Sequence, residues 1–232
     1  MPTVAELMTL HADSVPPEAT LADAASMMVG ARISSVVIVE QGRVIGILTE
    51  RDMLRAMRHH DDPQRLVREF MTAPVHTVRS DTEVRAAFRQ ASRLGIRHLV
   101  VTGQDGTLLG ILSETDFRRF FGLDFYRHLN TVEGLMERVF PRLPRSATLE
   151  EALAAMETAK ASSVVVMDGE NACGIVTERD VVRLYLKGEG NPPLFAVMTH
   201  PLASVGPETA AAEAAAMMLE ARIRHLIVVD QD

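Results

Sequence analysis

The sequence predicts a mixed α/β (α+β) fold built from one short unit that recurs along the chain. Glycine, apolar strand residues, a hydroxyl and a carboxylate stand in the same register in three segments: Gly46–Asp52, Gly110–Asp116 and Gly174–Asp180. These segments follow one another at a constant interval of 64 residues, which is typical of an array of homologous units. An apolar residue followed by methionine leads into each unit and occurs four times, at Met8, Met71, Met136 and Met198. We therefore expect four units, of which three are complete.

Each unit is expected to fold as strand, helix, strand, strand, helix. In the first unit, the alanine-rich segment 21–31 carries small apolar residues at helical spacing. Two short apolar runs, 35–39 and 44–48, then have the composition of strands. Gln41-Gly42 is expected to form the turn between them because glycine tolerates positive φ, and Gly103–Gly106 and Asp168-Gly169 occupy the equivalent places.

The units define the expected domain organisation. We place them at residues 1–60, 61–122, 123–188 and 189–232, with a long connection from Phe120 to Thr131 between the first pair and the second. The fourth unit ends before its third strand, which would leave the apolar segment 226–229 as an exposed edge. We therefore expect the native chain to continue beyond Asp232.

Composition excludes several classes of protein. The chain has 232 residues, 47% of them hydrophobic, which is ample for buried cores, and a formal net charge of −7 argues against a general nucleic-acid surface. The single cysteine, Cys173, allows no disulfide framework, and its apolar surroundings favour a buried strand residue over a nucleophile. No apolar run is long enough for a membrane span, and the N-terminus has no secretory signal. We expect a cytoplasmic protein.

The repeated hydroxyl and carboxylate have two interpretations. They could be helix N-caps, in which the hydroxyl accepts from a backbone N–H and the acid reaches back. They could also combine capping with ligand binding, since ribose and phosphate need these groups and a helix N-terminus attracts anions. The pairs are Thr49 and Asp52, Ser113 and Asp116, and Thr177 and Asp180.

Polar residues just before the second strand alternate between units. Odd units carry Ser34-Ser35 and Ser162-Ser163, whereas even units carry Arg97-His98 and Arg224-His225, so the array is a duplicated pair. Arginine and histidine at these places could be solvated strand-end residues. Near a helix N-terminus they would instead bind phosphate oxygens through charge-assisted hydrogen bonds. The second unit has both halves, and we predict its phosphate and ribose site at Arg97, His98, Ser113 and Asp116.

Other reactive residue types have simpler explanations. His59–Asp62 offers metal-ligating atoms, but adjacent residues rarely converge on one ion, which favours a solvated connection. The pairs Met27-Met28 and Met217-Met218 lie in alanine-rich segments, where core or interface packing is the default. Neither a catalytic triad nor a paired-acid constellation can be argued. We expect no catalytic residue, no metal and no enzyme activity within this chain.

These motifs resemble those of cystathionine-β-synthase-type (CBS) domains arranged as two Bateman modules. The resemblance covers essentially the whole chain and depends on the three in-register motifs, the methionine lead-ins and the paired strands. It implies that two repeats pack by their sheets into a pseudo-two-fold module, whose clefts bind AMP, ADP, ATP or S-adenosylmethionine as regulatory ligands. It further implies that the hydroxyl and acid pairs hold ribose and phosphate, and that the arginine and histidine pairs grip phosphates. The uncharged serine pairs would suit a less charged ligand, or their clefts would stay empty.

The resemblance also implies partners. Modules of this kind pair into homodimers, and they control an effector domain in the same native chain. A weaker resemblance, of the segment Phe121–Leu129 to linkers in bacterial signalling proteins, would make this chain the sensory end of a cyclic-di-GMP signalling enzyme. The alternative from a different class is a ligand-free dimerisation scaffold, in which the motifs act only as caps.

Overall fold

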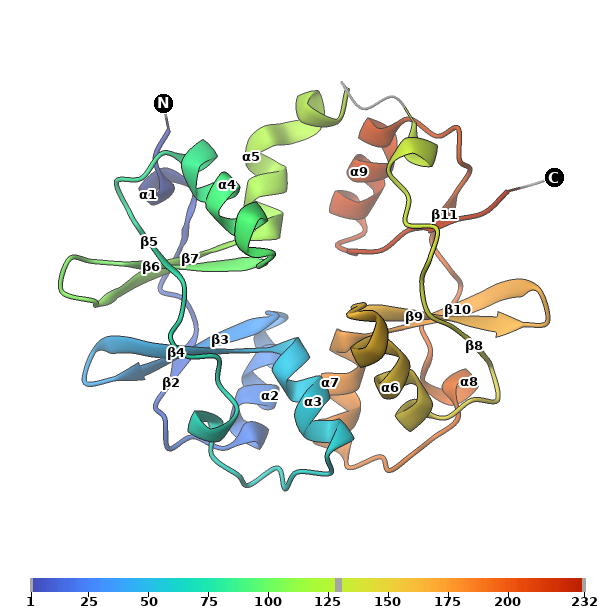
Figure 1. The fold of residues 1–232 in the computed structure, drawn as a ribbon, viewed down its shortest axis with the longest axis horizontal. Coiled ribbons are helices and arrows are strands. Elements are labelled where there is room, and N and C mark those ends of the chain that lie inside the picture. Colours follow the sequence, from blue (N-terminus) through green and yellow to red (C-terminus); the bar gives the residue numbers. More distant parts are fainter. Residues whose placement is uncertain (1, 128–130, 231–232) are drawn as a thin grey trace. The chain divides into compact units, whose positions relative to one another are not determined.

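The computed structural model describes residues 2–127 and 131–230. Its order of elements confirms the expected repeat of strand, helix, strand, strand, helix (Figure 1). The chain forms two compact units, each larger than a single repeat of the sequence. The first unit comprises residues 1–120 and 178–190, and the second comprises residues 121–177 and 191–232.

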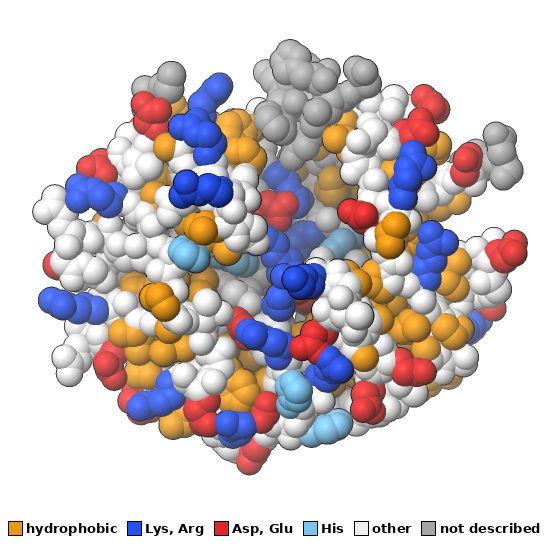
Figure 2. All heavy atoms as spheres, in the orientation of Figure 1, with side chains coloured by type: hydrophobic (Ala, Val, Ile, Leu, Met, Phe, Trp, Pro, Cys, Tyr) orange, Lys and Arg blue, Asp and Glu red, His pale blue; other side chains and the backbone are white. Residues whose placement is uncertain are grey.

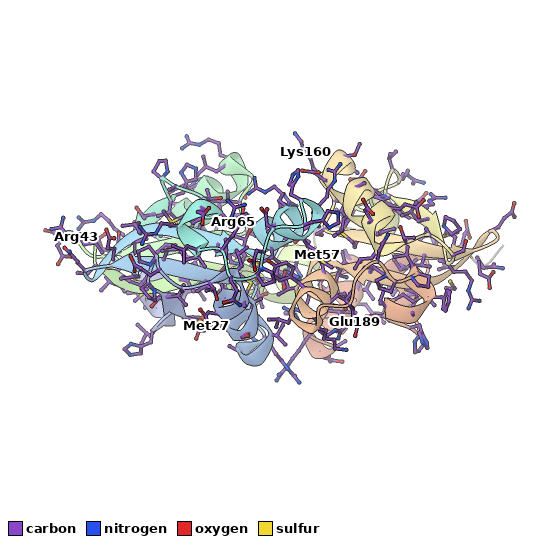
Figure 3. All side chains as sticks on the ribbon, turned by 90° about the horizontal axis from the view of Figure 1, so that it is seen from below. Met27, Arg43, Met57, Arg65, Lys160 and Glu189 are labelled. Carbon is purple, nitrogen blue, oxygen red and sulfur yellow. The ribbon has the colours of Figure 1, made fainter. Side chains whose placement is uncertain are left out.

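The first repeat follows the expected boundaries closely. Its elements are α1 (Val4–Leu7), β1 (Thr9–Leu10), β2 (Ser14–Val15), α2 (Leu21–Ala31), β3 (Ser35–Glu40), β4 (Arg43–Thr49) and α3 (Glu50–Arg58). Gln41 and Gly42, with φ of 50° and 82°, form the turn between β3 and β4, which places Arg43 at the tip of that hairpin (Figure 3). The second helix begins at Glu50, and Thr49 is its N-cap.

The second repeat departs from expectation at its end. Its elements are the 3-10 helix η1 (Val67–Glu69), β5 (Thr77–Arg79), α4 (Val84–Leu94), β6 (His98–Thr102), β7 (Leu108–Ser113) and α5 (Glu114–Arg127). The expected long connection after Phe120 is wrong, because α5 continues to Arg127 with a break at Gly122, where φ is 58°. Residues 128–130 lie outside the described residues, and with them part of the segment Phe121–Leu129 that resembled a signalling linker.

The sheets of the first two repeats pack face to face. Successive residues of β3 point to opposite faces. Val36 and Ile38 join the core formed with α2 and α3. Val37 packs instead with Val100 of β6. The β3–β4 and β6–β7 hairpins, which carry these residues, face each other in Figure 1. This arrangement confirms the pseudo-two-fold pairing of repeats.

The repeats also exchange their lead-in segments. Strand β1 belongs to the first repeat, yet it pairs antiparallel with β7 of the second. In return, Thr72 of the second lead-in forms a bridge with Ile47 of β4. The resulting sheets have the orders β2-β3-β4 and β1-β7-β6-β5. Each repeat therefore completes the sheet of its neighbour.

This exchange explains the repeated glycines. A Cβ built on Gly46 would lie 2.9 Å from Cγ of Met71, and one on Gly110 would lie 2.5 Å from the backbone oxygen of Thr9. In the second unit, a Cβ on Gly174 would lie 2.7 Å from Cγ of Met198. The glycine of each motif thus lies against the lead-in of the neighbouring repeat, and at Gly110 the close atom belongs to the backbone.

A helix from the third repeat belongs to the first unit. Helix α7 (Glu178–Lys187) contacts α2 and α3, and its Val182 and Tyr185 are buried in the core of the first repeat. The hydroxyl of Tyr185 donates to the backbone oxygen of Asp61 at 3.1 Å. The first unit is therefore built from residues of three repeats.

The second unit holds the remaining elements. They are η2 (Val132–Gly134), β8 (Arg142–Pro144), α6 (Leu149–Ala159), β9 (Ser163–Asp168), β10 (Asn171–Thr177), α8 (Leu194–Val197), β11 (Ser204–Val205), α9 (Ala211–Glu220) and β12 (Ile227–Val228). The first three strands form a sheet of order β10-β9-β8, and β11 pairs parallel with β12. Thr199 forms a bridge with Ile175 of β10, which repeats the lead-in exchange of the first unit.

Surface character agrees with the composition. Acidic and basic side chains lie interspersed with apolar ones on the face seen in Figure 2. Over the described part of the chain, no helix combines the length and apolar content that crossing a bilayer requires.

Candidate functional site

In the first two repeats, the residues before the second strand lie beside the start of the second helix. His98 is directly opposite Ser113 in the β6–β7 ladder, and the N–H of Glu114 donates to the backbone oxygen of Arg97 at 2.9 Å. In the first repeat, Ser35 is opposite Thr49 in the same way. The two sequence patterns, which lie about 15 residues apart, therefore meet at one end of each hairpin.

The hydroxyl and carboxylate pairs form helix caps in the first two repeats. The N–H and Oγ1 of Thr49 donate to Oδ2 of Asp52 at 2.8 and 2.7 Å. The N–H and Oγ of Ser113 donate to Oδ2 of Asp116 at 2.8 and 2.6 Å. In both pairs, a single carboxylate oxygen accepts both bonds.

The second carboxylate oxygen distinguishes the repeats. Oδ1 of Asp52 pairs with Arg55, and Oδ1 of Asp180 accepts from Arg183 Nη2 at 2.6 Å. Oδ1 of Asp116 has no partner among the described residues. The half-buried Asp116 thus has one carboxylate oxygen that could still accept a hydrogen bond.

A hydrogen bond joins the first repeat to the second. Oγ of Ser34 lies 2.8 Å from Nε2 of His98, and Oγ of Ser162 lies 2.8 Å from Nε2 of His225 in the second unit. The serine of one repeat and the histidine of the next, which alternate along the chain, are therefore in contact in both units. All four residues were predicted site residues, but the sequence does not indicate that they touch.

The contacts define what we call the Ser34–His98 cluster, which consists of Ser34, Arg97, His98, Ser113 and Asp116. It offers two hydroxyls, an imidazole, a guanidinium and a carboxylate, drawn from two repeats. These are the groups that bind the hydroxyls of a sugar and the oxygens of a phosphate.

Arg97 already has an acidic partner. Its Nη2 donates to Oε2 of Glu178 at 2.6 Å, and Nε of Arg51 donates to Oε1 of the same carboxylate at 3.1 Å. Glu178 is the first residue of α7, and its side chain has no exposed surface. Glu178 is not among the site residues that the sequence motifs predicted. The available signal was the glutamate that follows the motif hydroxyl in all three complete repeats.

A second ion pair joins the same two helices, with the arginine on α7 and the glutamate on α3. Nε of Arg179 on α7 donates to Oε1 of Glu50 on α3 at 3.3 Å, and the Glu50 side chain is only 1% exposed. Helices α3 and α7 therefore exchange arginine and glutamate contacts reciprocally at their N-termini.

The remaining predicted site residues are divided between the two units. Ser163 is opposite Thr177 in the β9–β10 ladder of the second unit, and Arg224 precedes His225 just before β12. Asp180 is buried on α7 and belongs to the first unit.

Other reactive residues are accounted for locally. Asp61 pairs with Arg65, and Oδ1 of Asp62 accepts from the N–H of Gln64 at 2.9 Å. Across the described residues, no group of three or more metal-ligating side chains is found. Cys173 is half-buried on β10, where its Sγ lies 3.4 Å from the backbone oxygen of Val166.

The family described as "CBS domain" matches at residues 4–59, 67–122, 132–187 and 194–232. The chain belongs to the CBS domain family.

Relatives share the repeats over part of their length. A 17.7 kDa uncharacterised protein of Acidianus ambivalens is 37% identical over 117 residues, which are 50% of this chain and 71% of the relative. Protein MJ1225 of Methanocaldococcus jannaschii is 26% identical over 162 residues, which are 64% of this chain but only 57% of the relative.

Solved structures confirm the fold. The crystal structure of MJ1225, described as a putative archaeal homologue of g-AMPK, has a TM-score of 0.89 at 17% identity, covering 99% of this chain and 94% of that one. A conserved protein of Pyrococcus horikoshii has a TM-score of 0.66 at 22% identity, covering 100% and 92%. At these identities the likeness shows the fold alone.

Proposed function

We propose that this chain is a regulatory module that binds an adenosine-type nucleotide at the Ser34–His98 cluster. The observation that carries the proposal is the 2.8 Å hydrogen bond between Ser34 and His98, which joins two repeats beside the cap of Ser113 and Asp116. The ligand class is AMP, ADP, ATP or S-adenosylmethionine, as the resemblance to nucleotide-binding CBS domains implies. The nucleotide acts as a regulatory ligand and not as a cofactor.

Each residue of the cluster has a role in this proposal. The unpaired oxygen of Asp116 accepts a ribose hydroxyl, while its other oxygen stays in the helix cap. Arg97 and His98 bind phosphate oxygens, and Ser34 keeps the imidazole oriented. In the first repeat, the equivalent ligand-binding role belongs to Ser35, Thr49 and Asp52.

A second site of the same kind lies in the second unit, at Ser162, Ser163, Thr177, Arg224 and His225. The hydrogen bond between Ser162 and His225 supports it, because its length of 2.8 Å equals that in the first unit.

The ligand regulates by binding one conformation more tightly than another. We propose that the module pairs with a second copy, acts in the cytoplasm and controls an effector domain of the native protein. Catalysis would belong to that domain and not to these repeats.

A ligand-free dimerisation scaffold is the alternative, and the caps favour it. Thr20 and Asp23 at the start of α2 form the same pair of bonds, at 2.9 and 2.7 Å, outside the Ser34–His98 cluster. Capping alone therefore explains the geometry of Ser113 and Asp116, and only ligand binding separates the two functions.

The test compares Asp116→Ala with Asp23→Ala. Each substitution removes a carboxylate that caps a helix in the same geometry, and each should cost about 1 kcal/mol of stability. Calorimetric titration with AMP, ADP, ATP and S-adenosylmethionine should show at least about tenfold weaker binding at one site for Asp116→Ala only, because a hydrogen bond to a charged group is worth about 1.5–3 kcal/mol. If no ligand binds the wild type at millimolar concentration, the scaffold is the better description. If a ligand binds the wild type and both variants equally well, the ligand does not contact Asp116 and the proposed site is wrong.

A further inference from the structure

Glu178 is a buried carboxylate that the proposed function does not use. It comes from the third repeat, yet it contacts Arg97 of the second repeat and Arg51 of the first. Its side chain has no exposed surface, whereas that of Arg97 is 26% exposed. Arg97 is therefore the member of this pair that an incoming ligand can reach.

Because the Glu178 carboxylate is buried, its stability depends on its hydrogen-bond partners. A carboxylate withdrawn from water is stable only when hydrogen-bonded cations compensate for the lost hydration. Arg51 and Arg97 provide this compensation at 3.1 and 2.6 Å. A phosphate that draws Arg97 away leaves Glu178 with a weaker set of partners, and the negative charges of phosphate and Glu178 also repel one another.

We propose that Glu178 is a specificity-determining residue of the nucleotide site, which holds Arg97 and thereby limits how much an anionic ligand gains over a neutral nucleoside. This inference rests on the proposed function. It assigns ligand discrimination to a residue of the third repeat, about 80 positions along the chain from the arginine that it controls.

The matched ligands are AMP and adenosine, which differ only in the phosphate. In Glu178→Gln the side chain keeps its shape and loses its charge, so Arg97 becomes available to the phosphate. Calorimetric titration should show AMP binding about tenfold tighter or more, because Glu178 no longer competes with the phosphate for Arg97. The affinity for adenosine should stay unchanged.

Glu69→Gln is the control for a general change in charge. Glu69 pairs with Arg65 in the first unit, and its side chain is 39% exposed. This variant removes the same formal charge without altering a contact of Arg97. Its ratio of AMP to adenosine affinity should equal that of the wild type.

Two further variants keep the inference testable if Glu178→Gln does not fold. Arg51→Gln removes the other partner of Glu178, which strengthens the hold on Arg97 and should weaken AMP binding several-fold. Arg97→Gln should weaken AMP binding and abolish the effect of a second substitution at Glu178 or Arg51.

The outcomes separate the two proposals. Failure of the wild type to bind either ligand overturns the nucleotide site itself. If both ligands bind and neither Glu178→Gln nor Arg51→Gln changes their ratio of affinities, the site stands and the role of Glu178 is wrong. An effect that persists in the Arg97→Gln background also overturns that role.

Discussion

At the scale of single residues, the motif glycines report a contact between repeats. Gly110 lies under the lead-in of the first repeat, where a Cβ would come within 2.5 Å of the backbone oxygen of Thr9. A backbone atom held in the β1–β7 pairing cannot rotate away as a side chain can. The glycine was noticed in the sequence as part of a ligand motif, but its structural reason is close approach.

Gly110→Ala should therefore destabilise the protein by about 1–3 kcal/mol, the usual cost of overpacking. The matched control is Gly30→Ala in α2, because no atom lies within 4 Å of a Cβ built there. That variant should be more stable than the wild type by about 0.5–1 kcal/mol, since alanine is the better helix former. Midpoints of urea unfolding measure both changes. Equal midpoints for the two variants would contradict the close contact.

At the scale of elements, α7 is the helix whose position the sequence does not reveal. It follows the third motif directly, but its Val182 and Tyr185 complete the core of the first repeat. Burial, followed by repulsion from Asp61 and Asp62, raises the pKa of Tyr185 to about 12. Its neutral hydroxyl also donates to the Asp61 backbone.

The raised pKa predicts a loss of stability in alkali. Because the pKa of an unfolded tyrosine is about 10, the unfolded chain releases the phenol proton first. The contribution of Tyr185 is therefore complete below about pH 10 and is lost as the pH rises towards 12. In Tyr185→Phe, urea unfolding at pH 7 should show a loss of about 1 kcal/mol for the missing hydrogen bond.

The comparison between the two proteins isolates this group. Between pH 10 and 12, the stability of the wild type should fall more steeply than that of Tyr185→Phe, because all other titrating groups are common to both. Parallel curves over this range would show that α7 does not bury the phenol in solution.

The elements that could be predicted from the sequence are those set by local patterns. The segment 21–31 and the turn at Gln41-Gly42 were found because helical spacing and glycine conformations are properties of neighbouring residues. The bond between Ser34 and His98 could not be found in this way, since it depends on how two repeats face each other. The ion pair of Arg97 and Glu178 is still harder to predict, because it depends on where a helix of the third repeat packs.

At the scale of the whole molecule, the ligand site and the boundary of the first unit are linked. The Ser34–His98 cluster draws on two repeats, and Glu178 adds a third, yet all of these residues belong to the first unit. A ligand present at 100 times its dissociation constant should stabilise the state that it binds by about 2.7 kcal/mol. That stabilisation should be shared by every element of the unit, including α7.

Hydrogen exchange with and without AMP measures this distribution. In the wild type, saturating AMP should slow amide exchange in β6, β7 and α7, although α7 lies more than 60 residues further along the chain. In Asp116→Ala, protection should disappear from all three elements together and persist around β9 and β12, where Ser162 and His225 form the second pair. If protection of α7 instead persists with that of β9, then α7 responds to the second site, and Glu178 has no part in the first.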